Sequence, residues 1–251
     1  MNVWQAVFLG WIQGLTEFLP ISSSGHLSLC YTLFDLPQNL FFSLLLHVGS
    51  LFAVCFAYRK TLWYLLCHPK DLRVRYLLLA TLPTVAFAAV FRFLLPDLVD
   101  GLLLPLGFAL TAVLLILGEK FSRPVLPILK AKPWIPLVCG VAQGFAVLPG
   151  LSRSGSTVSA LTLCGITRED AAEFSFLLSI PVILGSAAVE SVSVLRSSSA
   201  LSWGVVGVGV VCAAIGGYLG ILLLQKLLKK AKLRYFAYYL LFPFLLSLIL
   251  L

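Results

Sequence analysis

The sequence predicts an all-α polytopic membrane protein that forms a single membrane domain over residues 1–251. Hydrophobic residues make up 60% of the chain, charged residues only 11%, and the mean hydropathy is +1.03. These values lie outside the range of soluble globular domains. Apolar runs long enough to cross a bilayer, which takes about 20 residues, recur along the sequence. Because a spanning segment must satisfy its own backbone hydrogen bonds, these runs are predicted to be helices.

Six full spans are predicted from the apolar runs. They cover residues 40–58, 76–95, 102–118, 171–194, 201–225 and 235–251. Positive charge collects in the loops that follow the first, third and fifth spans, so these loops are predicted to be cytoplasmic. The short acidic segment 96–101 is predicted to lie outside. This charge distribution accounts for the net charge of +8, and we therefore expect no nucleic-acid partner.

Two further apolar stretches, residues 1–35 and 134–165, are each broken near the middle by Pro, Gly and Ser. The second stretch lies between Lys132 and Arg168, which are charges of the cytoplasmic type. It is therefore predicted to enter and leave at one membrane face, as a re-entrant helical hairpin. Irregular backbone at such a depth is tolerated only where it is buried in protein or lines a wet cavity. Both hairpin tips are therefore candidate sites.

The two broken stretches resemble each other. A shift of 130 residues places Gln13-Gly14 on Gln143-Gly144, and "SSSG" at 22–25 on "SRSG" at 152–155. A shift of 132 residues aligns "SLLLHVGS", which begins at Ser43, with "SFLLSIPV". Matches in the same order at a nearly constant offset indicate an internal duplication.

The duplication predicts a repeat of about 1–120 and a second of about 133–251, each one re-entrant hairpin followed by three transmembrane helices. An odd number of spans turns the second copy over. This is an inverted-topology repeat, an architecture in which broken helices form a site near the membrane midplane. Both chain termini are then expected on the extracytoplasmic side.

The tips carry polar side chains that suit a phosphate. These are Gln13, Glu17, Ser22, Ser23, Ser24 and His26 in the first tip, and Ser152, Arg153, Ser154, Ser156 and Thr157 in the second. Hydroxyl groups and a guanidinium at the start of a helix favour an anion, because backbone N–H groups there are free. The simpler alternative is that Glu17 and Arg153 only pair with each other, since an unpartnered charge in a membrane helix is costly.

A carboxylate would repel phosphate unless a divalent cation lay between them. Oxygen ligands favour Mg²⁺ or Ca²⁺, and Glu17 with Gln13 one turn earlier are the predicted metal ligands. His26 is a candidate for proton transfer, while Ser23 is a candidate nucleophile or phosphate ligand. For His47, inside an apolar run, we favour a hydrogen bond to a neighbouring backbone group over a role in a pocket.

At these residues the sequence resembles the bacterial undecaprenyl-diphosphate phosphatase family, the bacitracin-resistance proteins. "QGLTEFLPISSSGH" from Gln13 and "PGLSRSGST" from Pro149 match the two family motifs, and the likeness covers essentially the whole chain. The resemblance implies hydrolysis of undecaprenyl diphosphate to undecaprenyl phosphate and inorganic phosphate. This reaction recycles the lipid carrier for cell-wall synthesis and confers bacitracin resistance.

The resemblance also implies roles for individual residues. Glu17 would support the metal and the acid–base chemistry, and Ser23 with His26 would be the catalytic pair together with Arg153. The expected diphosphate-binding residues are Ser22, Ser152, Arg153, Ser154 and Thr157. Because the first acidic motif position is occupied by Gln13, a metal site with two carboxylates is not expected.

The expected location is the cytoplasmic (inner) membrane of a bacterium, with the active site opening to the extracytoplasmic side. The expected partners are a polyprenyl diphosphate substrate and membrane lipids, and the sequence leaves open whether the protein is a monomer or a homodimer. The alternative function is a lipid-phosphate flippase or transporter, because inverted repeats with broken helices are typical of transporters. A non-catalytic scaffold would give the polar tips no task.

Overall fold

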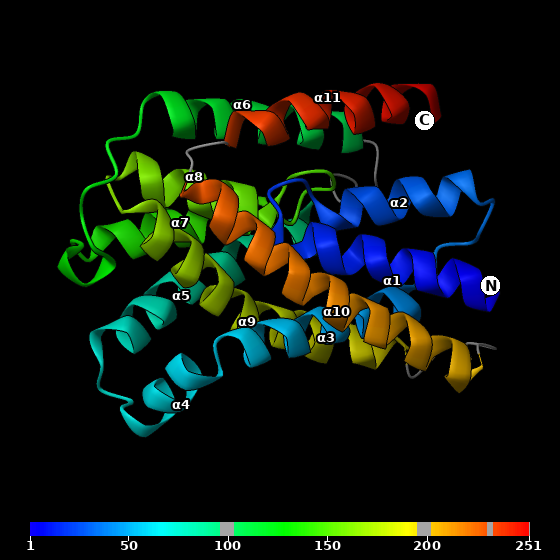
Figure 1. The fold of residues 1–251 in the computed structure, drawn as a ribbon, viewed down its shortest axis with the longest axis horizontal. Helices are drawn as coiled ribbons and strands as arrows, with labels where there is room; N and C mark the ends of the chain where they lie inside the picture. Colours follow the sequence, from blue (N-terminus) through cyan, green and yellow to red (C-terminus); the bar gives the residue numbers. More distant parts are fainter. Residues whose placement is uncertain (96–102, 195–201, 230–232, 251) are drawn as a thin grey trace.

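The computed structural model describes residues 1–95, 103–194, 202–229 and 233–250, and this part of the chain is helical throughout apart from its loops (Figure 1). The helices are α1 (Val3–Phe18), α2 (Ser23–Leu33), α3 (Leu40–Ala57), α4 (Arg59–Cys67), α5 (Leu72–Leu94), α6 (Leu104–Lys120), the 3₁₀ helix η2 (Ile128–Lys130), α7 (Trp134–Phe145), α8 (Arg153–Leu163), α9 (Arg168–Val194), α10 (Trp203–Leu228) and α11 (Leu233–Leu250).

The chain is a multi-pass membrane protein. Among the described residues, α3, α5, α9, α10 and α11 are long and apolar enough to cross a membrane. Each of them corresponds to a predicted span. The remaining predicted span forms α6, which has 17 residues and is not among these five. The predicted outer segment 96–101 lies outside the described residues.

The two broken stretches form the helix pairs α1–α2 and α7–α8, as predicted. Helix α1 ends at Phe18 because Leu19 precedes a proline and takes extended angles, φ −71° and ψ 146°, which a following proline favours. In the second stretch the chain turns at Gly150, whose φ is +80°, a backbone conformation suited to glycine. Proline thus ends α1, whereas α7 ends at Phe145 and Gly150 turns the chain shortly before α8 begins.

The helices that follow each turn begin in the same way. The hydroxyl of Ser22 accepts a hydrogen bond from the backbone N–H of Gly25 at 3.3 Å, and Ser152 accepts one from Gly155 at 3.1 Å. A serine at this position satisfies one of the free N–H groups of the first helical turn. The local likeness of the tips thus extends to their hydrogen bonds, while the inverted relation between the two halves stays a prediction.

Helices from the two halves pack closely through small residues. A Cβ atom added at Gly14 of α1 would stand 2.4 Å from the carbonyl oxygen of Ala213 in α10, and one at Gly10 would stand 2.4 Å from that of Gly209. Membrane helices approach this closely only where small residues meet, because there is little hydrophobic gain to bring them together. The contact fixes α1, and therefore the first tip, against the second half.

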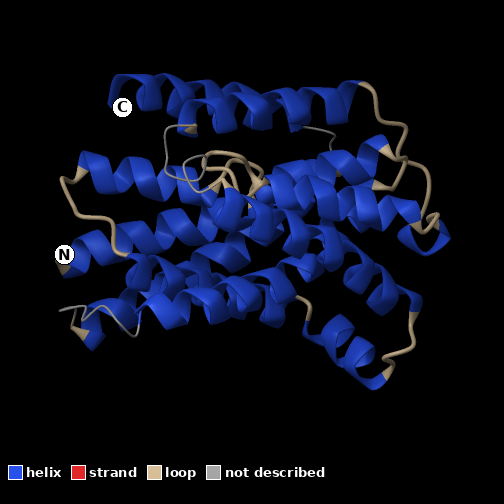
Figure 2. Ribbon diagram, turned by 180° about the vertical axis from the view of Figure 1, so that it is seen from behind, coloured by secondary structure: helices blue, strands red, loops and turns tan. Residues whose placement is uncertain are grey.

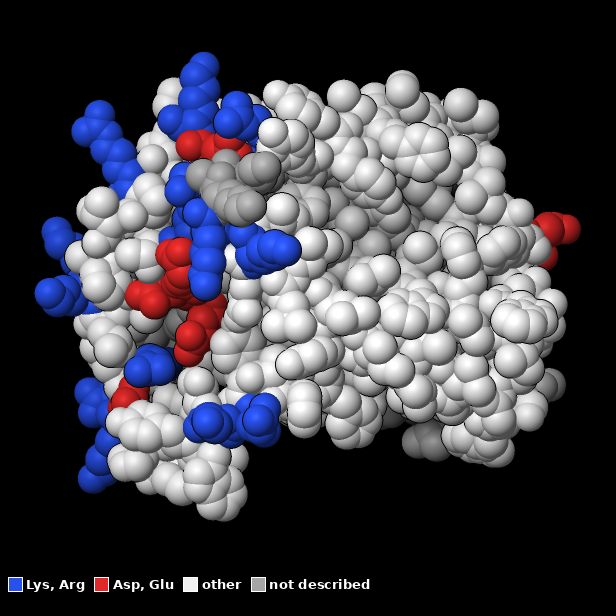
Figure 3. Space-filling model, viewed as in Figure 1, with Lys and Arg blue, Asp and Glu red and all other residues white. Residues whose placement is uncertain are grey.

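The basic side chains seen in Figure 3 lie toward one end of the molecule. Both termini lie at the same end in Figure 1, and nearly all Lys and Arg side chains seen in Figure 3 gather at the opposite end. The loops that join α1 to α2 and α7 to α8 lie near the middle of the molecule, among the helices (Figure 2). The predicted tips are therefore interior, at a distance from both ends.

Candidate functional site

The tips of the two hairpins contact each other directly. The guanidinium Nη2 of Arg153, at the start of α8, donates to Oε1 of Glu17 in α1 at 2.5 Å. The hydroxyl of Ser154 donates to the backbone carbonyl of Leu19 at 2.9 Å. Segments about 135 residues apart in sequence are thus joined by an ion pair and a hydrogen bond.

The carboxylate of Glu17 is the centre of this contact. Its Oε2 atom accepts hydrogen bonds from Nε2 of Gln13 at 2.8 Å and from the hydroxyl of Ser23 at 2.6 Å. The side chain is only 4% exposed, so a carboxylate here needs these donors to offset the loss of water. A serine hydroxyl that donates to a carboxylate, which is itself oriented by further groups, is the arrangement of an activated nucleophile.

A cavity of about 200 Å³ opens beside this cluster. Its polar lining includes Glu17, Ser22, Ser23, Ser24, His47, Ser152, Arg153 and Ser186. The helices α2 and α8 both begin at the cavity, so two helix N-termini and their free N–H groups are directed to the same place. Helix N-termini favour anions.

Arg153 leaves one donor unused. Its Nη1 atom is buried and has no hydrogen-bond partner in the described part of the chain, while Nη2 is bound to Glu17. A buried donor without a partner is costly, and an anion in the cavity would supply one. Ser22, at the mouth of α2, has a φ of +69°, and strained backbone of this kind is often found at functional sites.

Several predicted residues lie beside the cavity and do not line it. Nδ1 of His26 bonds the carbonyl of Ser22 at 2.7 Å, and Nε2 bonds the hydroxyl of Tyr239 in α11 at 2.9 Å. The structure therefore does not form the predicted pair of Ser23 with His26, because the Ser23 hydroxyl donates to Glu17. Both ring nitrogens of His26 are occupied by the protein.

The hydroxyl groups of Ser154 and Thr157 hold the second tip in place. Ser154 bonds the first tip, and the fully buried Thr157 contacts the hydroxyl of Ser175 in α9 at 2.6 Å. These two residues thus fix α8 against its neighbours.

His47 lines the cavity, although the sequence indicated only a backbone hydrogen bond for it. Its Nδ1 atom bonds the carbonyl of Ser43 at 2.8 Å, as we expected, but Nε2 lies 3.6 Å from Oε2 of Glu17 and the residue lines the cavity. The signal in the sequence is the repeat itself: the 132-residue shift places His47 on Ser179. A histidine in an apolar span without a histidine at the matching position of the other half is a signal that could have drawn attention to His47.

The oxygen atoms of Gln13 and Glu17 make up only part of a binding site for a divalent cation. Oε1 of Gln13 is buried and has no partner in the described structure, and it lies one helical turn from the Glu17 carboxylate. Among the described residues, no group of three or more His, Cys, Asp or Glu side chains gathers to hold a metal. Mg²⁺ is commonly bound by one or two carboxylates together with substrate phosphates, and two protein oxygens fit that arrangement.

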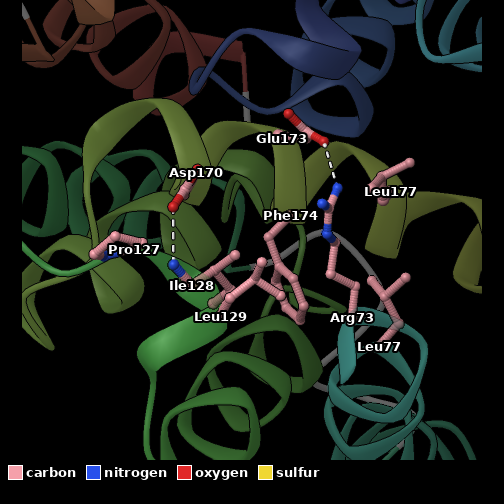
Figure 4. Close-up of a pocket in the computed structure, with 9 residues that line it drawn as sticks. All are labelled: Arg73, Leu77, Pro127, Ile128, Leu129, Asp170, Glu173, Phe174 and Leu177. Carbon is pink, nitrogen blue, oxygen red and sulfur yellow. Dashed lines mark hydrogen bonds and ion pairs between the residues drawn. The ribbon is translucent and has the colours of Figure 1, made fainter. Parts of the chain in front are cut away.

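A second cavity, of about 280 Å³, is lined by residues of α5, η2 and α9 (Figure 4). Arg73 and Glu173 face each other across it at 3.8 Å, and Asp170 accepts a hydrogen bond from the N–H of Ile128 at 2.8 Å. Glu173 precedes Ser186 of the first cavity by a helical rise of about 20 Å along α9. None of the tip residues lines this second cavity, so the first cavity is the candidate site.

Comparison with known proteins identifies the family. The family model described as bacitracin resistance protein BacA matches residues 6–244. The chain is 40% identical to the undecaprenyl-diphosphatase of Treponema denticola, over 96% of this chain and 94% of that protein. It is 37% identical to that of Carboxydothermus hydrogenoformans, over 95% and 94% of the two chains. It is also 32% identical to that of Methanococcus vannielii, over 93% and 94%. The chain belongs to the bacitracin resistance protein BacA family.

Proposed function

We propose that this chain is an integral membrane phosphatase that hydrolyses undecaprenyl diphosphate to undecaprenyl phosphate and inorganic phosphate. The names of its relatives support this activity. The observation that carries the proposal is the Arg153 guanidinium, which holds the Glu17 carboxylate with one nitrogen and leaves a second, buried nitrogen free. A transporter would need to bind the headgroup, but it would not need a serine hydroxyl bonded to a carboxylate.

The first chemical step follows from the contacts of Ser23. Its hydroxyl attacks the terminal phosphorus, its proton passes to Oε2 of Glu17, and the bond to the bridging oxygen breaks to release the lipid phosphate. Arg153 and the N–H groups at the starts of α2 and α8 hold the phosphate oxygens, where negative charge is spread in the transition state. This step leaves a phosphoserine.

The other predicted residues have supporting roles in this proposal. Ser22 and Ser152 offer hydroxyl and backbone groups at the cavity wall, and Ser154 and Thr157 keep the second tip in position. His26 acts as a positioning residue, because its hydrogen bond to the carbonyl of Ser22 holds the strained turn that places Ser23. This role differs from the catalytic pairing that the family resemblance implies.

A divalent cation, Mg²⁺ or Ca²⁺, would be held by Glu17 and Gln13 together with oxygens of the diphosphate. It would neutralise charge on the substrate and so allow the diphosphate to approach a carboxylate. With a single carboxylate in the set, the protein contributes little charge to cation binding. We expect the cation to bind mainly with the substrate.

The proposed location is the bacterial cytoplasmic membrane, with both termini outside and the active site opening to the extracytoplasmic side. Two observations support this orientation. Nearly all Lys and Arg side chains seen in Figure 3 lie toward the end opposite to both termini, and cytoplasmic loops carry an excess of these residues. The lining residue Ser186 also lies far along α9 from the charged start of that helix.

The direct test is phosphate release from undecaprenyl diphosphate by the purified protein, with Mg²⁺ or Ca²⁺ and with a chelator. Ser23→Ala should abolish release, whereas the matched control Ser28→Ala, on the same helix outside the cavity, should not affect it. Release of no phosphate by the wild-type protein under any metal condition would exclude the phosphatase. Movement of the lipid phosphate across vesicles under those conditions would then favour the transporter.

A further inference from the structure

We infer that His47 holds the water molecule that completes the hydrolysis and accepts its proton. This inference rests on the proposed phosphatase function, because it concerns the second step, in which the phosphoserine is cleaved. It assigns a catalytic task to a residue outside both family motifs.

The hydrogen bonds of His47 determine which nitrogen faces the cavity. Nδ1 lies 2.8 Å from the carbonyl oxygen of Ser43, and a carbonyl can only accept, so Nδ1 must carry the hydrogen. In the neutral ring, Nε2 therefore presents a lone pair. Nε2 is the atom that lies 3.6 Å from Oε2 of Glu17, and the side chain is 28% exposed.

The distance of 3.6 Å has a simple explanation. Before the first step, with His47 neutral, both Nε2 of His47 and Oε2 of Glu17 are acceptors, so no direct hydrogen bond forms between them. After the first step Oε2 carries the Ser23 proton, and Nε2 of His47 is then the acceptor for a water molecule in the cavity, which has room for one. The cavity wall also includes Ser23, whose Oγ atom carries the phosphate after the first step.

His26 cannot perform this task in the observed arrangement. Its two ring nitrogens bond Ser22 and Tyr239, and it does not line the cavity. Among the described residues that line the cavity, His47 is the histidine, and Glu17 is the carboxylate. These two groups must therefore share the proton transfers of the reaction.

The order of the two steps assigns one transfer to each group. In the first step Glu17 takes the proton of Ser23 and becomes a neutral acid. In the second step the water oxygen bonds phosphorus, one water proton passes to Nε2 of His47, and the bond from phosphorus to Oγ of Ser23 breaks. Glu17 returns its proton to Oγ as that bond breaks. Inorganic phosphate leaves, and the exposed side of His47 passes its proton to solvent.

The test separates the two products in time. Substrate labelled at the terminal phosphate is mixed with a stoichiometric amount of the full-length protein in detergent, and samples are quenched at intervals. Lipid monophosphate, inorganic phosphate and label on the denatured protein are measured for the wild type, His47→Leu and His47→Gln. The matched control is His68→Gln, because His68 makes the same bond to a backbone carbonyl, Tyr64 at 2.9 Å, but is exposed and remote from the cavity.

For His47→Leu we expect a rapid release of one lipid monophosphate per protein molecule. Release of inorganic phosphate should be slowed by about 100-fold or more, the usual contribution of a general base, and label should accumulate on Ser23. His47→Gln keeps an acceptor that can orient water but cannot take its proton, so its rate of phosphate release should lie between those of His47→Leu and the wild type. His68→Gln should behave as wild type.

Two outcomes would overturn the inference. One is equal slowing of both products in His47→Leu with no labelled protein, since a merely structural effect would not separate the steps. The other is release of inorganic phosphate from His47→Leu within about threefold of the wild-type rate. A wild-type protein that forms neither product would instead overturn the proposed function, and the two failures are therefore distinguishable.

Discussion

Replacement of Arg153 by lysine tests the proposed anion clamp most directly. The arginine side chain is 14% exposed, pairs with a carboxylate that is 4% exposed, and keeps a second buried nitrogen free. A lysine retains the positive charge but is a single point of contact, so it cannot bond the carboxylate and a phosphate in the same fixed geometry. Arg153→Lys therefore keeps the positive charge but removes the fixed geometry of the two contacts.

The expected magnitudes differ between the two properties that Arg153 affects. Loss of one preorganised donor to transition-state charge reduces kcat by about 100- to 1,000-fold, or about 2.7 to 4 kcal/mol. Folding should change little in Arg153→Lys, because Glu17 keeps a cationic partner. Arg153→Ala leaves the buried carboxylate unpaired, which costs about 3 to 5 kcal/mol of stability, so this variant should lose both activity and thermal stability.

The assay measures phosphate release at saturating substrate and the Tm of each purified variant in the same detergent. The expected pattern is a normal Tm with low kcat for Arg153→Lys, and a reduced Tm with low kcat for Arg153→Ala. A lysine variant with kcat within about threefold of wild type would show that charge alone suffices and would refute the role of the guanidinium. A low Tm for lysine would show that Arg153 acts mainly through folding.

Three further predictions concern the surroundings of this contact. Glu17→Gln should reduce kcat by about 100-fold or more because it removes the proton acceptor. Gln13→Glu should keep activity and require less Mg²⁺ in a metal titration, and a larger loss of kcat in Gln13→Glu than in Glu17→Gln would show that the two roles are exchanged. Gly14→Ala should lower the Tm, because its Cβ would lie 2.4 Å from the backbone of α10. The control Gly207→Ala, at a position with open space around it, should leave the Tm unchanged, and equal Tm values for the two variants would contradict the close helix contact. Tyr239→Phe removes one hydrogen bond and should cost about 1 kcal/mol of stability with kcat nearly unchanged; a large loss of kcat at normal Tm would assign the hydroxyl a part in the chemistry.

The membrane character of the chain was evident from the sequence. Hydropathy and span length depend on local composition, and the helices α3, α5, α9, α10 and α11 follow the predicted apolar runs. The breaks at both tips were also predictable, because a proline restricts the residue before it, here Leu19, and a glycine permits the positive φ seen at Gly150. The polar residues in the tips predicted a phosphate site.

The contacts between the tips are a product of the tertiary structure. Glu17 and Arg153 were predicted to be near each other, but their sequence separation carries no information on which oxygen or nitrogen is bound. The packing of α1 on α10 and of α8 on the first tip places Ser23 on the carboxylate. The same packing turns His26 toward Tyr239.

The two histidines show most clearly what each level determined. Sequence motifs singled out His26 because it follows the serine cluster directly, and they gave His47 no more than a local backbone bond. The direction of a side chain depends on the rotation of its helix against neighbouring helices, which hydropathy alone does not specify in an apolar span. Hydropathy and the two broken stretches are enough to predict a membrane protein with two polar tips, whereas the packing of α3 against α1 sets which histidine faces the carboxylate.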